Sequence, residues 1–120
     1  MDINELVHKE QLMDEELQTL LKAKEEGKID FLLIDVREPF EYEMAHIEPT
    51  DMLLPTSRFQ EWFGKIQNLK EKNIILYCRT GNRSYQLQQI MKRYGFKSVG
   101  NLTYGIVAYS GKIAQGPFEK

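Results

Sequence analysis

Two apolar runs of strand length, residues 31–36 (FLLIDV) and 73–78 (NIILYC), constrain the fold more than any other feature. Their hydrophobicity is flat rather than alternating, which is typical of strands that are buried on both faces of a parallel sheet. Helical periodicity precedes the first run at residues 14–26 and follows the second at residues 84–94. This alternation predicts an α/β fold with a central, mainly parallel sheet of about five strands and helices on both faces.

Shorter elements are indicated between and after these runs. We expect short helices at residues 38–45 and 106–110, short strands at 52–55 and 98–101, and a helix whose apolar face is Phe59, Trp62, Phe63 and Ile66. Ser57 and Gln60 stand in capping-box spacing at the start of this helix, although Gly64 weakens its middle. No repeat or linker divides the 120 residues, so we expect one domain over 1–120, with its motifs within about 14–115.

Composition excludes several functional classes. A single cysteine cannot form an intramolecular disulfide, which fits a reducing compartment and makes the cytoplasm the expected location. The sequence has no signal-peptide pattern and no run near the roughly 18 apolar residues of a membrane span, so we expect no membrane partner. Residues 1–51 carry a charge of −10 and residues 52–120 a charge of +8. The basic half lacks a dense Lys/Arg cluster and the whole chain is acidic, so we expect no nucleic-acid binding.

The single cysteine, Cys78, ends the second apolar run and is followed by RTGNRS. Ligand sites in open α/β sheets lie at the carboxyl ends of the strands. Gly81 allows consecutive backbone N–H groups to point at one spot, where the next helix also presents its positive end. We therefore expect a thiol pKa below the ordinary value of about 8.5. The alternative is a buried structural thiol, but two arginines and four small or polar residues favour an anion cradle.

Four segments carry a resemblance to a known family. They are LLIDVREPFEY (32–42), HI (46–47), IILYCRTGNRS (74–84) and, more loosely, GFKSVGNLTYGIVAY (95–109). In this order and at these separations the chain resembles a single-domain rhodanese, a member of the sulfurtransferase family, over about two thirds of its length. The resemblance implies a rhodanese-like three-layer fold.

The resemblance also implies roles for individual residues. Cys78 would attack the outer sulfur of an anionic donor, such as thiosulfate or a persulfide, and carry it as a persulfide to a small thiol, cyanide or a protein thiol. Arg79 and Arg83 would bind and orient the donor, without a metal or cofactor. The backbone cradle would run over Thr80, Gly81, Asn82, Arg83 and Ser84, and Asp35, Arg37 and His46 would give structural support.

Two alternatives remain open at this stage. Phosphatases and arsenate reductases related to this fold carry Cys-x5-Arg, whereas here four residues separate Cys78 from Arg83. A non-enzymatic sulfur-carrier or interaction module would usually lack the cysteine or the arginines, and neither is missing. The chain departs from the family pattern at Ala45, in EPTDMLLP after Ile47, and at Tyr104 and Tyr109. These departures leave the donor, the acceptor and the oligomeric state open.

Overall fold

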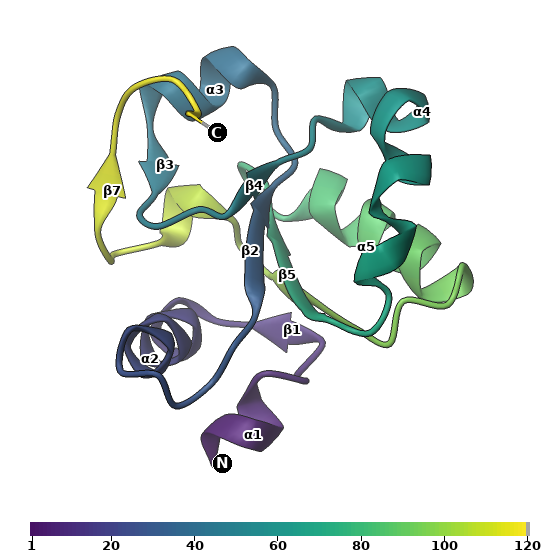
Figure 1. The fold of residues 1–120 in the computed structure, drawn as a ribbon. Helices are drawn as coiled ribbons and strands as arrows, with labels where there is room; N and C mark the ends of the chain where they lie inside the picture. The colour runs from purple at the N-terminus through teal and green to yellow at the C-terminus, as the bar shows by residue number, and fades with distance from the viewer. Residues whose placement is uncertain (120) are drawn as a thin grey trace.

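The computed structural model describes residues 1–119 and is built around a five-stranded sheet (Figure 1). The strand order is β1-β6-β5-β2-β4, and every neighbouring pair is parallel. The strands are β1 (Gln11–Leu12), β2 (Leu32–Asp35), β4 (Met52–Leu53), β5 (Asn73–Tyr77) and β6 (Ser98–Leu102). The predicted α/β class is confirmed, and the two apolar runs form β2 and β5, which pair with each other near the centre of the sheet.

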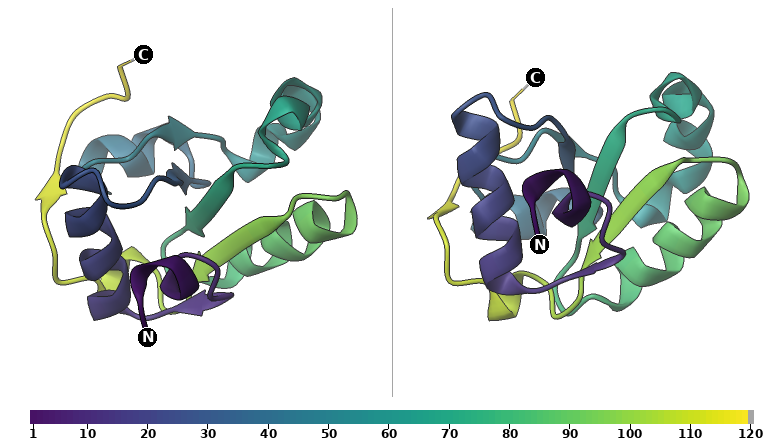
Figure 2. Two further views of the ribbon diagram at one scale, coloured as in Figure 1. Left: turned by 60° about the horizontal axis from the view of Figure 1, so that its bottom comes forward. Right: turned by 90° about the horizontal axis from the view of Figure 1, so that it is seen from below.

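Helices cover both faces of the sheet, as predicted (Figure 2). α1 (Ile3–Leu6) and α2 (Asp14–Glu25) pack on one face, and α4 (Phe59–Trp62) and α5 (Asn82–Arg93) pack on the other. Alternate residues of the central strands divide between the two cores: Leu33, Ile75 and Tyr77 join the α2 side, and Ile34, Ile74, Leu76 and Cys78 join the α5 side. Burial on both faces explains why the hydrophobicity of these strands does not alternate.

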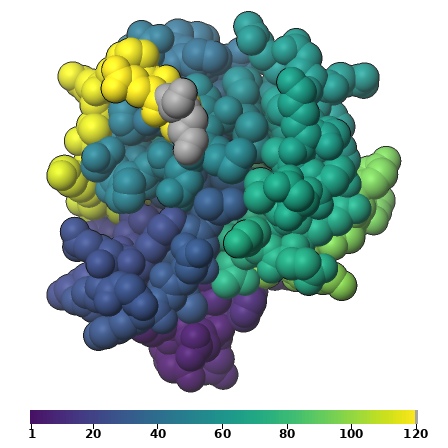
Figure 3. Space-filling model, in the orientation of Figure 1, coloured from purple at the N-terminus to yellow at the C-terminus, as the bar shows by residue number. Residues whose placement is uncertain are grey.

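A second, antiparallel pair of strands was not predicted. β3 (His46–Ile47) follows α3 (Pro39–Met44) and pairs with β7 (Ile113–Ala114). Each strand has two residues, which is too short for a periodic signal. The C-terminal segment then runs over α3 and β3, as the yellow and blue surfaces of Figure 3 show, and Phe118 meets the ring of Tyr42 edge-on at 5.4 Å.

The helix expected around Phe59–Ile66 is interrupted. A 3₁₀ turn, η1 (Thr56–Arg58), leads into α4, and the chain changes to the 3₁₀ segment η2 (Phe63–Leu69) just before Gly64, where helix propensity is low. The capping-box prediction was wrong, because no side chain caps either start. Instead, Trp62 Nε1–H donates to the Pro55 carbonyl at 2.7 Å and ties this segment down.

Other differences are at element ends. The predicted helix at 106–110 is a 3₁₀ turn, η3 (Ile106–Ala108), and α5 begins two residues before the predicted start because Gly81 is its N-cap. α1 and β1 were not predicted at all. Within residues 1–119, no helix is long and apolar enough to cross a membrane.

Candidate active site

Cys78 directly follows β5, at the carboxyl edge of the sheet, where a ligand site is expected. Its side chain is only 1% exposed. Gly81 turns the chain back toward α5 with φ 99°, and a Cβ at this position would lie 2.0 Å from the Thr103 carbonyl oxygen. Both the left-handed conformation and this close approach require glycine. The loop is therefore held in one shape by β6 and the residues after it.

Three hydrogen bonds converge on the sulfur atom. The backbone N–H groups of Gly81 and Ser84 donate to Cys78 Sγ at 3.1 and 3.5 Å, and the Ser84 hydroxyl donates at 3.3 Å. Burial by itself raises the pKa of the Cys78 thiol, but the hydrogen bonds from Ser84 and Gly81, together with the nearby N–H group of Thr80, outweigh it and hold the pKa below its usual value. The direction is as predicted, although Ser84 rather than the arginines is the main cause.

The segment after β6 holds the cysteine loop through backbone hydrogen bonds. Ile106 N–H donates to the Cys78 carbonyl at 2.9 Å, and Val107 N–H donates to the Arg79 carbonyl at 3.2 Å. Gly105 has φ 70°, and a Cβ there would lie 2.1 Å from the Arg79 carbonyl oxygen. This contact explains a glycine immediately after Tyr104, where the family pattern is otherwise altered.

The two loop arginines have different surroundings. Arg83 donates twice to the carboxylate of Glu41 in α3, from Nη1 to Oε1 at 2.8 Å and from Nη2 to Oε2 at 3.0 Å. Hydrogen bonding to Arg83 lowers the pKa of Glu41 to about 2. Arg79 is exposed and forms no ion pair with any residue of the described chain. Sequence reasoning missed Glu41, because it lies 42 positions before Arg83 in the chain.

Asp35 and Arg37 form a buried pair at the end of β2. Asp35 is 0% and Arg37 4% exposed. Arg37 donates through Nε and Nη2 to the carboxylate at 3.0 and 2.8 Å, and Nη2 also donates to the Ala45 carbonyl at 2.6 Å. These bonds join the end of β2 to the end of α3, which is the kind of contact a structural role requires.

His46 is buried next to the same helix. Its Nδ1–H donates to the Tyr42 carbonyl at 2.8 Å, and its ring stacks on that of Tyr42 at 3.7 Å. The two remaining cradle residues, Thr80 and Asn82, are exposed, and Asn82 is the first residue of α5. Over residues 1–119, no group of three His, Cys, Asp or Glu side chains is placed to hold a metal ion.

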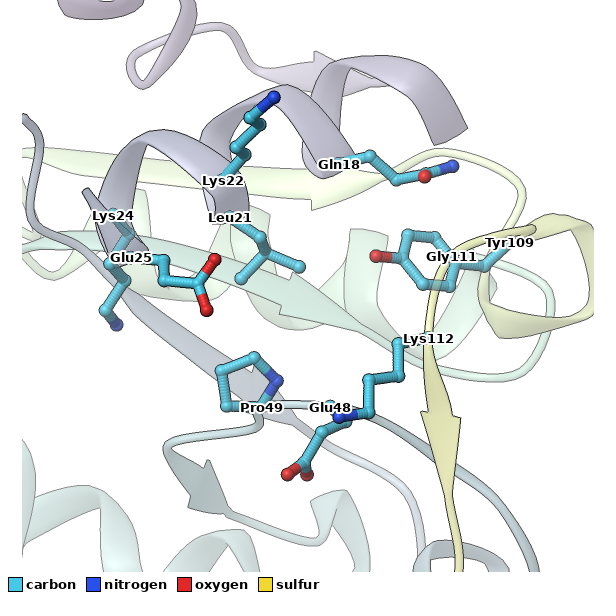
Figure 4. Close-up of a pocket in the computed structure, with 10 residues that line it drawn as sticks. All are labelled: Gln18, Leu21, Lys22, Lys24, Glu25, Glu48, Pro49, Tyr109, Gly111 and Lys112. Atoms are coloured by element: carbon cyan, nitrogen blue, oxygen red, sulfur yellow. The ribbon is translucent and has the colours of Figure 1, made fainter.

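Two hollows in the surface were compared with the position of the cysteine loop. A pocket of about 590 Å³ lies on the α2 face, where Leu21, the Glu25 carboxylate and the Tyr109 hydroxyl point inward (Figure 4). No residue of the cysteine loop lines it. A smaller hollow of about 150 Å³ lies between η1, α4 and α5 and is lined in part by Arg83. Of these two hollows, only the smaller is lined by a residue of the cysteine loop, Arg83, so size alone does not identify the site.

Comparison with known proteins agrees with this geometry. The sequence model of the rhodanese-like domain matches residues 16–112. The chain is 32% identical over 103 residues to a protein named putative thiosulfate sulfurtransferase, mitochondrial, from Schizosaccharomyces pombe, covering 78% of this chain and 72% of that protein. It is 37% identical over 90 residues to a tRNA uridine(34) hydroxylase of Escherichia fergusonii, covering 72% of this chain but only 25% of the hydroxylase.

A solved structure gives the same result for the fold. The rhodanese-related protein of Thermoplasma volcanium superposes with a TM-score of 0.72 at 21% identity, covering 88% of this chain and 97% of that one. The strand order, the cysteine loop at the end of β5 and the extent of the family match together show that this chain belongs to the rhodanese-like domain family.

Proposed function

We propose that this protein is a sulfurtransferase that carries sulfane sulfur as a persulfide on Cys78. The observation that supports this most directly is the set of three hydrogen bonds donated to Cys78 Sγ by the loop. Groups that hold Sγ as a thiolate keep it in the form that attacks the sulfur of a donor. The relative named as a thiosulfate sulfurtransferase points to the same class of reaction.

The first half-reaction consumes the donor. The Cys78 thiolate attacks the outer sulfur of thiosulfate, a sulfur–sulfur bond forms to Cys78, and the bond between the two donor sulfurs breaks. The products are the Cys78 persulfide anion and sulfite, and the total charge of −3 is conserved. The donor anion lies at the N-terminus of α5, where the N–H groups of the loop and Arg79 attract negative charge.

The second half-reaction needs an acceptor from outside the chain. The sequence contains one cysteine, so no second thiol of this chain can take the sulfur from Cys78. A small thiol, cyanide or a protein thiol attacks the terminal sulfur, forms a new bond to it and leaves Cys78 as the thiolate. Such chemistry needs a reduced thiol, and the cytoplasm is therefore the compartment that we propose.

Intact-mass measurement tests the first half-reaction. After incubation with thiosulfate, the wild-type protein should gain the mass of one sulfur atom, and Cys78→Ser should gain none. The sulfur should leave on addition of cyanide, with thiocyanate as the product. No adduct with thiosulfate, mercaptopyruvate or glutathione persulfide would refute the proposal and leave a non-enzymatic interaction module as the better explanation.

A phosphatase assay separates the remaining alternative. The interval of four residues between Cys78 and Arg83 is one shorter than the Cys-x5-Arg loop of the related phosphatases. We therefore expect no Cys78-dependent turnover of an aryl phosphate. Turnover that is lost in Cys78→Ser would favour the phosphatase instead.

A further inference from the structure

The charges around the cysteine loop cancel in two pairs. Asp35 and Arg37 form one pair, and Glu41 and Arg83 form the other. Within the part of the chain that the structure describes, Arg79 is the loop cation that no carboxylate neutralises. The loop therefore offers an incoming anion its N–H groups and one net positive charge.

Two hydrogen bonds hold the Glu41 and Arg83 side chains in a fixed relative orientation. Two parallel hydrogen bonds of 2.8 and 3.0 Å join the guanidinium to the carboxylate, the arrangement that orients an arginine most firmly. The Glu41 side chain is 16% exposed, so water screens the pair only in part. Arg83 directly precedes Ser84, whose N–H and hydroxyl groups donate to Cys78 Sγ, so the charge of Arg83 acts near the sulfur. A donor at Cys78 therefore meets the charge of Arg83 together with the opposite charge of Glu41.

We propose that Glu41 is a specificity-determining residue that adapts the site to singly charged sulfane-sulfur donors and disfavours dianions such as thiosulfate. This inference rests on the proposed sulfurtransferase function. Glu41 repels a dianion about twice as strongly as a monoanion at the same position, because the interaction energy is proportional to the product of the charges. Thiosulfonates and persulfides of low charge belong to the favoured class.

Thiosulfate and methanethiosulfonate form a matched pair of donors. Both present a terminal sulfur on a tetrahedral sulfonyl centre, but a methyl group replaces one charged oxygen in the second, so their charges are −2 and −1. In each case the Cys78 thiolate takes the outer sulfur, and sulfite or methanesulfinate leaves with the bonding electrons. The transferred atom is the same, and the intrinsic difference between the two leaving groups is common to all variants. The change in the ratio of the two kcat/KM values from one variant to another therefore isolates the effect of donor charge.

The experiment compares that ratio, thiosulfate over methanethiosulfonate, in wild type and Glu41→Gln at low ionic strength. Glutamine keeps the size of the side chain and removes its charge, which leaves Arg83 free to attract the donor. We expect the ratio to rise by up to about fivefold, which is the effect that one unit charge has on another at a separation of about 4 Å in water. Glu43→Gln removes an exposed carboxylate from the same helix and should leave the ratio unchanged.

A double variant distinguishes an effect of the Glu41 charge from a general disturbance of the fold. Glu41→Gln combined with Arg83→Gln removes both charges together, so no unpaired charge is left and the ratio should return to the wild-type value. An unchanged or lower ratio in Glu41→Gln, or a raised ratio that persists in the double variant, would overturn the role of Glu41 while leaving the enzyme active. Failure of both donors, and of mercaptopyruvate and glutathione persulfide as well, to place sulfur on wild-type Cys78 would instead refute the proposed function, and the specificity with it.

Discussion

Ser84→Ala should raise the pKa of Cys78 and move the activity profile to higher pH. The Ser84 hydroxyl is buried, with the residue 0% exposed, and donates to Cys78 Sγ at 3.3 Å. A hydrogen bond to a charged acceptor contributes about 1.5–3 kcal/mol. Sulfur accepts long bonds, and the neutral thiol also keeps a weaker one, so we take about 1.4 kcal/mol as the difference. That corresponds to a rise of about 1 in the pKa.

The single cysteine makes this pKa directly measurable. Thiolate ultraviolet absorbance is followed against pH, and the same titration of Cys78→Ser is subtracted to remove the tyrosine signal. The rate of persulfide formation from thiosulfate should shift over the same pH range, because only the thiolate attacks. Below the wild-type pKa, Ser84→Ala should react about tenfold more slowly, and at high pH the two rates should converge.

Ser57→Ala is the matched control, since Ser57 is an exposed serine of the η1 turn. Its thiol pKa should equal that of wild type. An unaltered Cys78 pKa in a folded Ser84→Ala protein would refute the reasoning, because the hydroxyl could then not be the group that stabilises the thiolate.

Three further predictions concern the support of the loop. The pKa of Glu41 falls from 4.5 to about 2 in the folded protein, so its stabilising effect is present above pH 4.5 and is lost as the pH falls toward 2. Because the Arg83 side chain is 38% exposed, solvent weakens the pair. Over that pH range, the free energy of unfolding in urea should fall by about 1–2 kcal/mol more for wild type than for Glu41→Gln. Equal decreases would contradict this prediction. Gly105→Ala should lower the free energy of unfolding by about 2–4 kcal/mol, because Gly105 has a positive φ and contacts the cysteine loop. Gly27→Ala should lower it by only about 1 kcal/mol, because Gly27 has a similar φ but open space around it; thermal melts of both variants measure the difference. Arg83→Ala should lower kcat/KM for thiosulfate at least about tenfold, since it leaves Glu41 unpaired beside the donor, while Lys112→Ala should have little effect because surface charge is screened; equal effects would mean that the general positive field binds the donor.

Local patterns identified the long elements of this fold. The apolar runs that became β2 and β5 and the periodic segment that became α5 are signals carried by consecutive residues, so they can be read without the rest of the chain. The helix after Pro55 shows the limit of such signals. Its apolar side chains Trp62 and Ile66 are buried as expected, but Gly64 and the bond from Trp62 to Pro55 decide that most of it is 3₁₀ rather than α.

The short strands could not be predicted because their partners are remote. Ile47 pairs with Ile113 in the antiparallel sheet, and Gln11 pairs with Asn101 at the edge of the main sheet. A two-residue strand has no pattern of its own and exists only because tertiary packing brings a partner within hydrogen-bonding distance.

The sequence by itself determined the α/β class, the position of Cys78 at the end of a buried strand and the length of the loop that follows it. The first two properties depend on patterns of consecutive residues, and the third depends only on the number of residues between Cys78 and Arg83. Only the tertiary structure decided which groups stabilise the sulfur and which charges remain unpaired beside it. Ser84 became the principal hydrogen-bond donor, and Glu41 neutralised Arg83, because hydrogen bonds and charge pairs depend on distances of a few ångströms between residues that can lie far apart in the chain.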